Sequence, residues 1–159
     1  LDLYGYTDRD GDGWRELPDG GPLVLDIATQ PDQISRQFDE LWKRNMDAVG
    51  IRTQFNAGKW PEQLKQARAG KLMLWVLGST AGSPDGQGSL ARMHGPQAGG
   101  QNLARFRLPA MDAVYEKLSG LPDGPEREQL FLEAKRLAVA YMPYKTHVHR
   151  IATDMVHPW

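Results

Sequence analysis

The stretch IRTQFNAGKWPEQLKQARAGKLMLWVL, residues 51–77, contains three segments with different hydrophobic patterns. In its first six residues Ile, Thr and Phe alternate with Arg, Gln and Asn, which is typical of a strand with one face toward a core. The middle segment predicts a helix that begins at Trp60 and ends at Gly70. The run 72–77 is apolar at every position, as expected of a strand covered by helices on both faces.

The preceding residues extend this pattern toward the N-terminus. The segment 23–29 (LVLDIAT) is rich in strand-forming residues and lies between two prolines. A helix is predicted from Pro31 to the stop at Gly50, with apolar side chains at three- and four-residue spacing. The resulting order is β-α-β-α-β. Strands joined by helices run parallel with right-handed crossovers, so we expect an α/β fold whose ligand-accessible edge lies at the strand carboxyl ends.

The second half of the chain predicts two more helices and a last strand. A glycine-rich segment without periodicity, residues 78–102, comes first, and a loop of this length is uncommon unless it is functional or mobile. One helix is expected from Pro109 to its stop at Gly120, and another starts at Asp123 and Pro125 and ends before Pro143. The alternation in residues 145–154 predicts a final strand.

Composition and charge limit the function. A chain of 159 residues is close to the size of one domain, so we expect residues 1–159 to form a single domain. The 19 basic and 20 acidic residues give a net charge of −1, which argues against a nucleic-acid partner. There is no cysteine and no apolar run long enough to span a bilayer. The start at Leu1 indicates a fragment of a longer chain.

An acidic segment near the N-terminus matches part of a calcium-binding loop. Asp8, Asp10, Asp12 and Gly13 fit its first, third, fifth and glycine positions, but Asp19 replaces the terminal bidentate Glu. The alternative is a series of Asx turns, in which each Asp accepts a nearby backbone N–H. We expect no metal or other cofactor, and calcium at these residues is retained as the alternative. A calcium-stabilised interaction module without a small-molecule ligand is accordingly one alternative function.

Catalytic motifs are weak. None of the serines in the loop 78–102 lies in a G-x-S-x-G elbow, and no His or Asp is placed so as to indicate a triad. A small hydrolase that uses this loop is therefore an alternative rather than the expected function. A zinc site is not expected either, because neither carboxylate spacing nor a fourth ligand supports the three C-terminal histidines, His147, His149 and His157.

Five segments in order resemble one known family. They are DRDGDGWRELPDGGPLVL (8–25), DAVGIRTQF (47–55), GKWPEQLKQARAGKLMLWVLG (58–78), NLARFRLPAMDAVYEKL (102–118) and PEREQLFLEAKRLAVAYMPYKTHVHR (125–150). Their order and spacing resemble the C-terminal lobe of family 5 extracellular solute-binding proteins, the peptide-binding-type components of ABC importers. The resemblance covers nearly the whole chain.

The resemblance implies a periplasmic binding protein-like fold and a non-enzymatic function. The chain would form most of one lobe of a two-lobed receptor, and the N-terminal lobe of the same parent chain would be missing. The receptor would capture an oligopeptide, a dipeptide or a related polar compound in a cleft between the lobes and deliver it to ABC permease subunits. The parent protein would be periplasmic or exposed on the cell surface.

The resemblance also implies which residues contact the ligand. Trp60 stands where the family commonly has a Trp in the cleft. The family's peptide receptors read G-W-x-x-D-Y-P-D-P where this chain has residues 78–86, so that Ser79 replaces the Trp and Gly82 replaces the Asp that pairs with a peptide amine. The loss of that Asp weakens the expectation of a peptide N-terminus. The expected ligand-binding residues are Trp60, Ser79, Thr80, Gly82, Ser83, Asp85 and Asn102.

Overall fold

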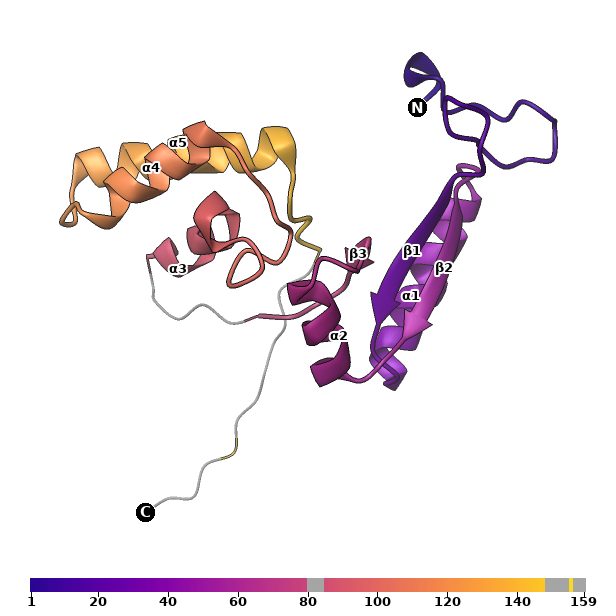
Figure 1. The fold of residues 1–159 in the computed structure, drawn as a ribbon, viewed down its shortest axis with the longest axis horizontal. Coiled ribbons are helices and arrows are strands. Elements are labelled where there is room, and N and C mark those ends of the chain that lie inside the picture. The colour runs from indigo at the N-terminus through magenta and orange to yellow at the C-terminus, as the bar shows by residue number, and fades with distance from the viewer. Residues whose placement is uncertain (80–84, 148–154, 156–159) are drawn as a thin grey trace.

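A computed structural model describes residues 1–79, 85–147 and 155 of the chain. Three parallel strands form a sheet in the order β2-β1-β3, with β1 at Val24–Thr29, β2 at Arg52–Ala57 and β3 at Leu74–Trp75. In the register of the sheet, Ile27 of the central strand is opposite Phe55 on one side and Leu74 on the other. The predicted β-α-β-α-β order and the α/β class are confirmed (Figure 1).

The helices connect the strands and form the second half of the chain. In the described part of the chain they are α1 (Gln33–Asp47), α2 (Trp60–Arg68), α3 (Gln87–Leu90), α4 (Pro109–Ser119) and α5 (Pro125–Tyr141), with short 3₁₀ turns at Asp2–Tyr4, Ala91–Met93 and Gly95–Gln97. Figure 1 shows α1 along the strands β1 and β2, with α4 and α5 side by side at the other end of the molecule. None of these described helices is long and apolar enough to cross a membrane.

Local signals set the ends of α1. The Asp32 carboxylate accepts hydrogen bonds from the Ser35 backbone N–H at 2.9 Å and from the Ser35 hydroxyl at 2.7 Å, so it caps the first turn. Beyond the helix, Gly50 has φ +73°, and a Cβ there would lie 2.9 Å from the Gly13 carbonyl oxygen. Its own carbonyl accepts the Arg15 N–H at 2.7 Å. Glycine at position 50 therefore lets the acidic entry segment pack against the α1–β2 turn.

Strand β3 differs from the expectation in length and burial. It contains two residues instead of six, and Met73, Leu74 and Val76 are 62%, 43% and 41% exposed. The reason is its place at the edge of the described sheet, where it pairs with β1 only. The predicted final strand is not seen in residues 145–147, and the rest of it lies outside the described residues.

The main apolar core lies between the helices of the second half. Met111, Leu118 and Ala134 have no exposed surface, and Leu90 of α3, Val114 of α4 and Leu130 of α5 complete this buried cluster. In the sheet, Ile27 and Ala28 of β1 are each 6% exposed. The carboxyl ends of the strands and the loop after Leu90 therefore lie between the buried residues of β1 and the core of α3, α4 and α5.

Candidate functional site

A hollow of about 740 Å³ lies where β3 ends, between α2 and the loop that follows the helix α3. Trp60, Leu64 and Arg68 of α2 form one wall, and residues 77–79 after β3 form another. The remaining lining residues are Arg92, Pro96, Gln97, Ala98, Gly99, Gly100, Gln101, Leu103 and Tyr144. The hollow thus occupies the strand-end edge at which open α/β sheets bind ligands.

Trp60 gives the hollow an aromatic surface. Its side chain is 40% exposed, and its ring packs against the Trp75 ring with 4.9 Å between centroids and an interplanar angle of 34°. Trp60 starts α2, where Pro61 at the next position is compatible with the first helical turn. An exposed indole supported by a second indole suits stacking against a ligand.

Gln63 holds this aromatic pair to the sheet, and sequence reasoning missed it. The residue is only 4% exposed. Its side-chain amide donates to the Thr29 carbonyl oxygen at 2.6 Å and to the Asn56 carbonyl oxygen at 3.3 Å. Its Oε1 accepts the Trp75 indole N–H at 3.0 Å. One side chain therefore joins the carboxyl ends of β1 and β2 to the tryptophan of β3.

Asn102 has a structural part in the loop beside the hollow. The side chain is fully buried. Its amide donates to the His94 carbonyl oxygen at 3.0 Å and to the Phe106 carbonyl oxygen at 2.7 Å, and its Oδ1 accepts the Phe106 N–H at 3.2 Å. Both amide hydrogens are used inside the loop, so Asn102 shapes the rim and does not present its amide to the hollow.

Arg105 fastens the same loop to α2. Its guanidinium donates to the Arg68 carbonyl oxygen, an acceptor left open at the end of α2. The guanidinium lies against Gly70 and Gly99, where added Cβ atoms would come within 2.5 Å and 3.3 Å of it. Arg105 itself has φ +53°, a left-handed conformation that is uncommon outside glycine. This contact keeps the two sides of the hollow together.

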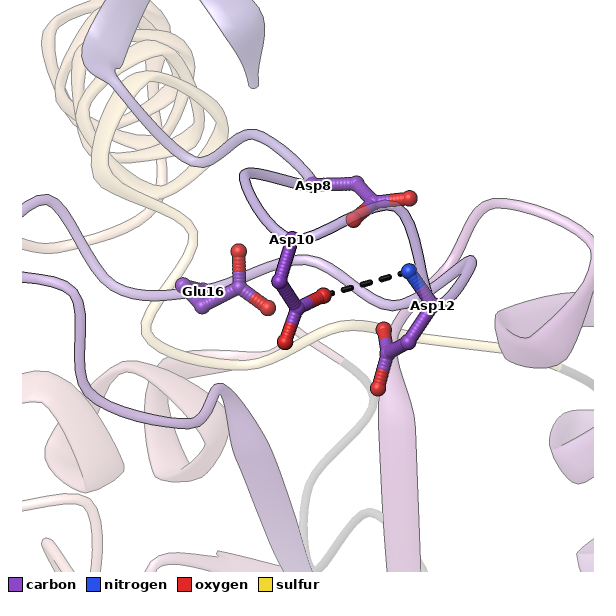
Figure 2. A group of neighbouring side chains, drawn as sticks. All are labelled: Asp8, Asp10, Asp12 and Glu16. Carbon is purple, nitrogen blue, oxygen red and sulfur yellow. Dashed lines mark hydrogen bonds between the residues drawn. The ribbon is translucent and has the colours of Figure 1, made fainter.

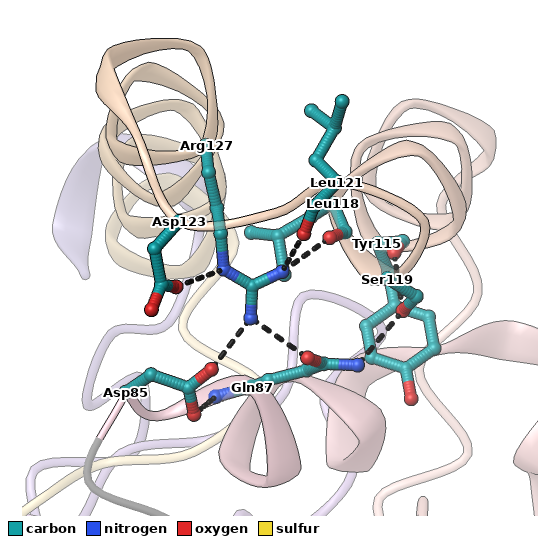
Figure 3. A network of polar contacts seen from close by, with 8 residues as sticks. All are labelled: Asp85, Gln87, Tyr115, Leu118, Ser119, Leu121, Asp123 and Arg127. Atoms are coloured by element: carbon teal, nitrogen blue, oxygen red, sulfur yellow. Dashed lines mark hydrogen bonds and ion pairs between the residues drawn. The ribbon is translucent and has the colours of Figure 1, made fainter.

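Asp85 belongs to a buried network around Arg127, shown in Figure 3. The Arg127 side chain is 7% exposed and pairs with the Asp85 carboxylate at 2.5 Å. It also donates to the Gln87 side-chain oxygen at 2.8 Å and to the Leu118 and Leu121 carbonyl oxygens at 2.5 and 3.0 Å. Asp85 therefore anchors the start of α3 to the α4–α5 turn and is not among the residues that line the hollow.

The predicted site residues thus separate into three groups. Trp60 and Ser79 line one hollow together. Asp85 and Asn102 hold the surrounding structure through their hydrogen bonds. The remaining three, Thr80, Gly82 and Ser83, lie outside the described residues. Ligand contact by any member of the set remains a prediction.

The acidic entry segment brings four carboxylates together, as Figure 2 shows. The ligand atoms of Asp8, Asp10, Asp12 and Glu16 lie within 4.8 Å of one another. Asp8 accepts the N–H groups of Gly11 and Gly13 at 2.7 and 2.9 Å, and Asp10 accepts the Asp12 N–H at 3.1 Å. The Asp10 bond is one of the expected Asx turns, and Asp12 makes another by accepting the Trp14 N–H at 2.8 Å, whereas Asp8 accepts N–H groups three and five residues further on. These hydrogen bonds hold the Asp carboxylates in place without an ion, and calcium binding stays the alternative to the expectation of no metal.

Three comparisons with known proteins show what the chain is similar to. A scan against protein-family models found no match. The chain is 27% identical over 137 residues to the di/tripeptide-binding protein 2 of Pseudomonas aeruginosa, covering 84% of the chain and 26% of that protein. It is 23% identical over 138 residues to the heme-binding protein A of Haemophilus influenzae, covering 86% of the chain and 24% of that protein.

The fold has solved counterparts. It superposes with a TM-score of 0.77 on a periplasmic oligopeptide-binding protein of Thermotoga maritima in complex with mannohexaose, at 18% identity, over 90% of this chain and 28% of that one. The architecture is therefore that of a periplasmic binding protein-like α/β domain. The similarity to family 5 extracellular solute-binding proteins that the sequence predicts is confirmed. The chain spans about a quarter of the length of the curated relatives it matches.

Proposed function

We propose that residues 1–159 form most of the C-terminal lobe of the substrate-binding component of an ABC importer. The observation that carries this proposal is the hollow at the strand carboxyl ends, which Trp60 lines with an exposed indole. That indole packs against the Trp75 ring, and Gln63 holds Trp75 in place by a hydrogen bond. Its position matches the general place of ligand sites in open α/β sheets. A second lobe of the parent chain would close over it, and closure would supply specificity.

The solute in this proposal is an oligopeptide, a dipeptide or a related polar compound. The relatives are named for a di/tripeptide and for heme, and the Thermotoga maritima protein holds mannohexaose. This range supports a polar solute of some size and does not single out a peptide. The replacement of the amine-binding Asp by Gly82 in the sequence points away from recognition of a peptide amine.

The receptor would work without chemistry on its ligand. Both relatives are named as binding proteins. Among the described residues, no serine is hydrogen-bonded to a histidine, so no described pair supports the hydrolase alternative. In this proposal the receptor delivers its solute to an ABC permease from the periplasm or the cell surface. The proposal includes no nucleic-acid partner.

The test is a solute screen on the product of the whole gene that contains this chain. A ligand that binds only the native state raises the melting temperature by mass action, so peptides, oligosaccharides and organic acids are compared by thermal shift. We expect one class to shift melting and Trp60→Ala to reduce that shift. Trp42→Ala is the matched control, because Trp42 lies on α1 and packs against His147 outside the hollow. A flat response to every class, or equal losses in both variants, contradicts the proposal.

A further inference from the structure

The charge of the hollow is one-sided. Two arginines, Arg68 and Arg92, are among the described residues that line it, and no Asp or Glu is. This contrasts with the neutral balance of the whole chain, which has 19 basic and 20 acidic residues. A concave surface with cations and no carboxylates concentrates a positive potential and favours an anionic occupant.

Neither arginine has a partner for its guanidinium among the described contacts. Elsewhere in the chain Arg15, Arg52 and Arg127 each pair with a carboxylate. Arg92 is half-buried beside the hollow, whereas Arg68 is exposed at the end of α2. A partly desolvated cation without a counter-charge is costly, and a bound anion would relieve that cost.

Tyr144 adds a donor to the same wall. Its hydroxyl oxygen accepts the Ala104 backbone N–H at 3.2 Å, so the hydroxyl hydrogen stays available to a ligand. The planar guanidinium of Arg92 can donate two parallel hydrogen bonds to one oxyanion. Donors at Arg68, Arg92 and Tyr144 require acceptors on the ligand.

We propose that the ligand of this site carries an acidic oxyanion group, a carboxylate or a phosphate, which Arg92 binds with help from Arg68 and Tyr144. The inference rests on the proposed function, because it names the class of solute that the hollow receives. Arg105 and Asn102 contribute by fixing the loop that forms the rim. The acidic group enters between α2 and this loop, while the rest of the solute contacts the Trp60 face.

The experiment is an NMR titration of the 159-residue chain with succinate and, separately, with inorganic phosphate, at constant ionic strength maintained with chloride. A single lobe binds weakly, and NMR follows binding in the millimolar range. We expect saturable shifts of the Trp60 indole signal. Arg92→Gln should weaken this binding about tenfold, the loss typical of one charge-assisted hydrogen bond. Arg44→Gln, on the exposed side of α1, should leave it unchanged.

The two probes separate the two sources of the oxyanion. Saturation by succinate alone assigns a carboxylate, and saturation by phosphate alone assigns a phosphate-bearing solute. Shifts that do not saturate, or equal affinity in the wild type and Arg92→Gln, overturn the inference. A neutral solute found in the screen, bound equally by Arg92→Gln, also overturns it but leaves the proposed function standing. If no solute class shifts the melting temperature in the thermal-shift screen but succinate still binds through Arg92, the proposed function is contradicted and the oxyanion inference stands.

Discussion

The indole N–H of Trp75 donates a 3.0 Å hydrogen bond to the side-chain oxygen of Gln63. This bond orients the ring against which Trp60 packs, so the exposed face of Trp60 is positioned from the interior of the sheet. Gln63 makes its other bonds to the carbonyl oxygens of Thr29 and Asn56, at the ends of β1 and β2. The aromatic wall of the hollow is therefore coupled to the strand ends through one buried amide.

Replacement of Gln63 tests this coupling. Gln63→Leu keeps a side chain of similar size but leaves the Trp75 indole N–H without its acceptor, whereas the Thr29 carbonyl oxygen keeps the Gly58 N–H at 3.0 Å. We expect a loss of about 1–3 kcal/mol in the free energy of unfolding, measured by urea denaturation, because that is the cost of an unsatisfied buried group. The control is Gln66→Leu at an exposed position of the same helix. Equal stability of the two variants would show that the amide is not structural.

Arg127 provides a second test, in the helical half. Its guanidinium joins Asp85 and Gln87 to the carbonyl oxygens of Leu118 and Leu121, and the side chain is nearly buried. Arg127→Met removes every one of these bonds, including the ion pair with Asp85. We expect a loss of about 3 kcal/mol in unfolding free energy, in the range for breaking a buried ion pair.

Two further variants distinguish the loss of the hydrogen-bond network from the general effect of replacing an arginine. Arg136→Met lies on the exposed side of α5 and should change stability by less than about 0.5 kcal/mol. Asp85→Asn combined with Arg127→Met should cost less than the sum of the two single changes, because both remove the same interaction. Strict additivity would show that the two side chains act independently.

The sequence predicts the elements of this fold well because each depends on a local pattern. The helices at Gln33–Asp47 and Pro109–Ser119 follow from apolar spacing and from nearby capping or breaking residues. The short length and exposure of β3 do not follow from its apolar run, since they depend on what lies beside it in space. An apolar run indicates burial in a complete fold, and the chain spans about a quarter of its relatives.

The site was predicted less completely, for a physical reason that Asp85 and Gln63 illustrate. Asp85 pairs with Arg127, 42 residues away, and no local pattern reveals such a pair. Gln63 reads as the polar side of an amphipathic helix, yet it faces the strand ends. The one local signal is Gly58, where a Cβ would lie 3.1 Å from the Gln63 amide nitrogen. Glycine at position 58 therefore leaves room for the buried Gln63 side chain, which a larger residue would crowd.

Asp39 predicts a pH dependence of stability. Burial raises the pKa of its carboxyl above the ordinary value, although a 3.1 Å hydrogen bond from the Thr29 hydroxyl opposes this shift and the nearby Asp32 charge adds to it. The folded state therefore holds the proton more strongly than the unfolded chain. As pH rises from about 4 through the raised pKa, the folded state binds more protons than the unfolded state, so the contribution of Asp39 to stability falls.

Asp39→Asn removes this titration and keeps an acceptor for the Thr29 hydroxyl. We expect the variant to be more stable than the wild type at pH 7, by up to about 1 kcal/mol, and the difference to shrink toward pH 3.5. Glu40→Gln, at the exposed neighbouring position, is the control. Urea denaturation at intervals between pH 3.5 and 7 measures the difference, and a gap that widens on acidification would refute the assignment.

Asp8 tests whether the acidic segment is held by turns or by an ion. Its carboxylate accepts two backbone N–H groups, from Gly11 at 2.7 Å and from Gly13 at 2.9 Å. Asp8→Ala removes both bonds, so we expect a loss of about 1–2 kcal/mol in unfolding free energy, as for the loss of a capping side chain. If the turns alone hold the segment, that loss is the same in EDTA and in millimolar calcium.

Calcium calorimetry on the wild type and Asp8→Ala completes the test, because an ion that binds only the folded state stabilises it increasingly, with the logarithm of its concentration above the dissociation constant. The Asx-turn interpretation predicts neither binding heat nor a calcium-dependent change in melting for either protein. Asp19→Asn serves as a control, since Asp19 would be the last ligand of a calcium loop but caps only the Gly21 N–H, at 3.0 Å. A melting increase with calcium that disappears in Asp8→Ala would establish a calcium site at the cluster of Asp8, Asp10, Asp12 and Glu16, and its loss in Asp19→Asn as well would add Asp19 as a ligand.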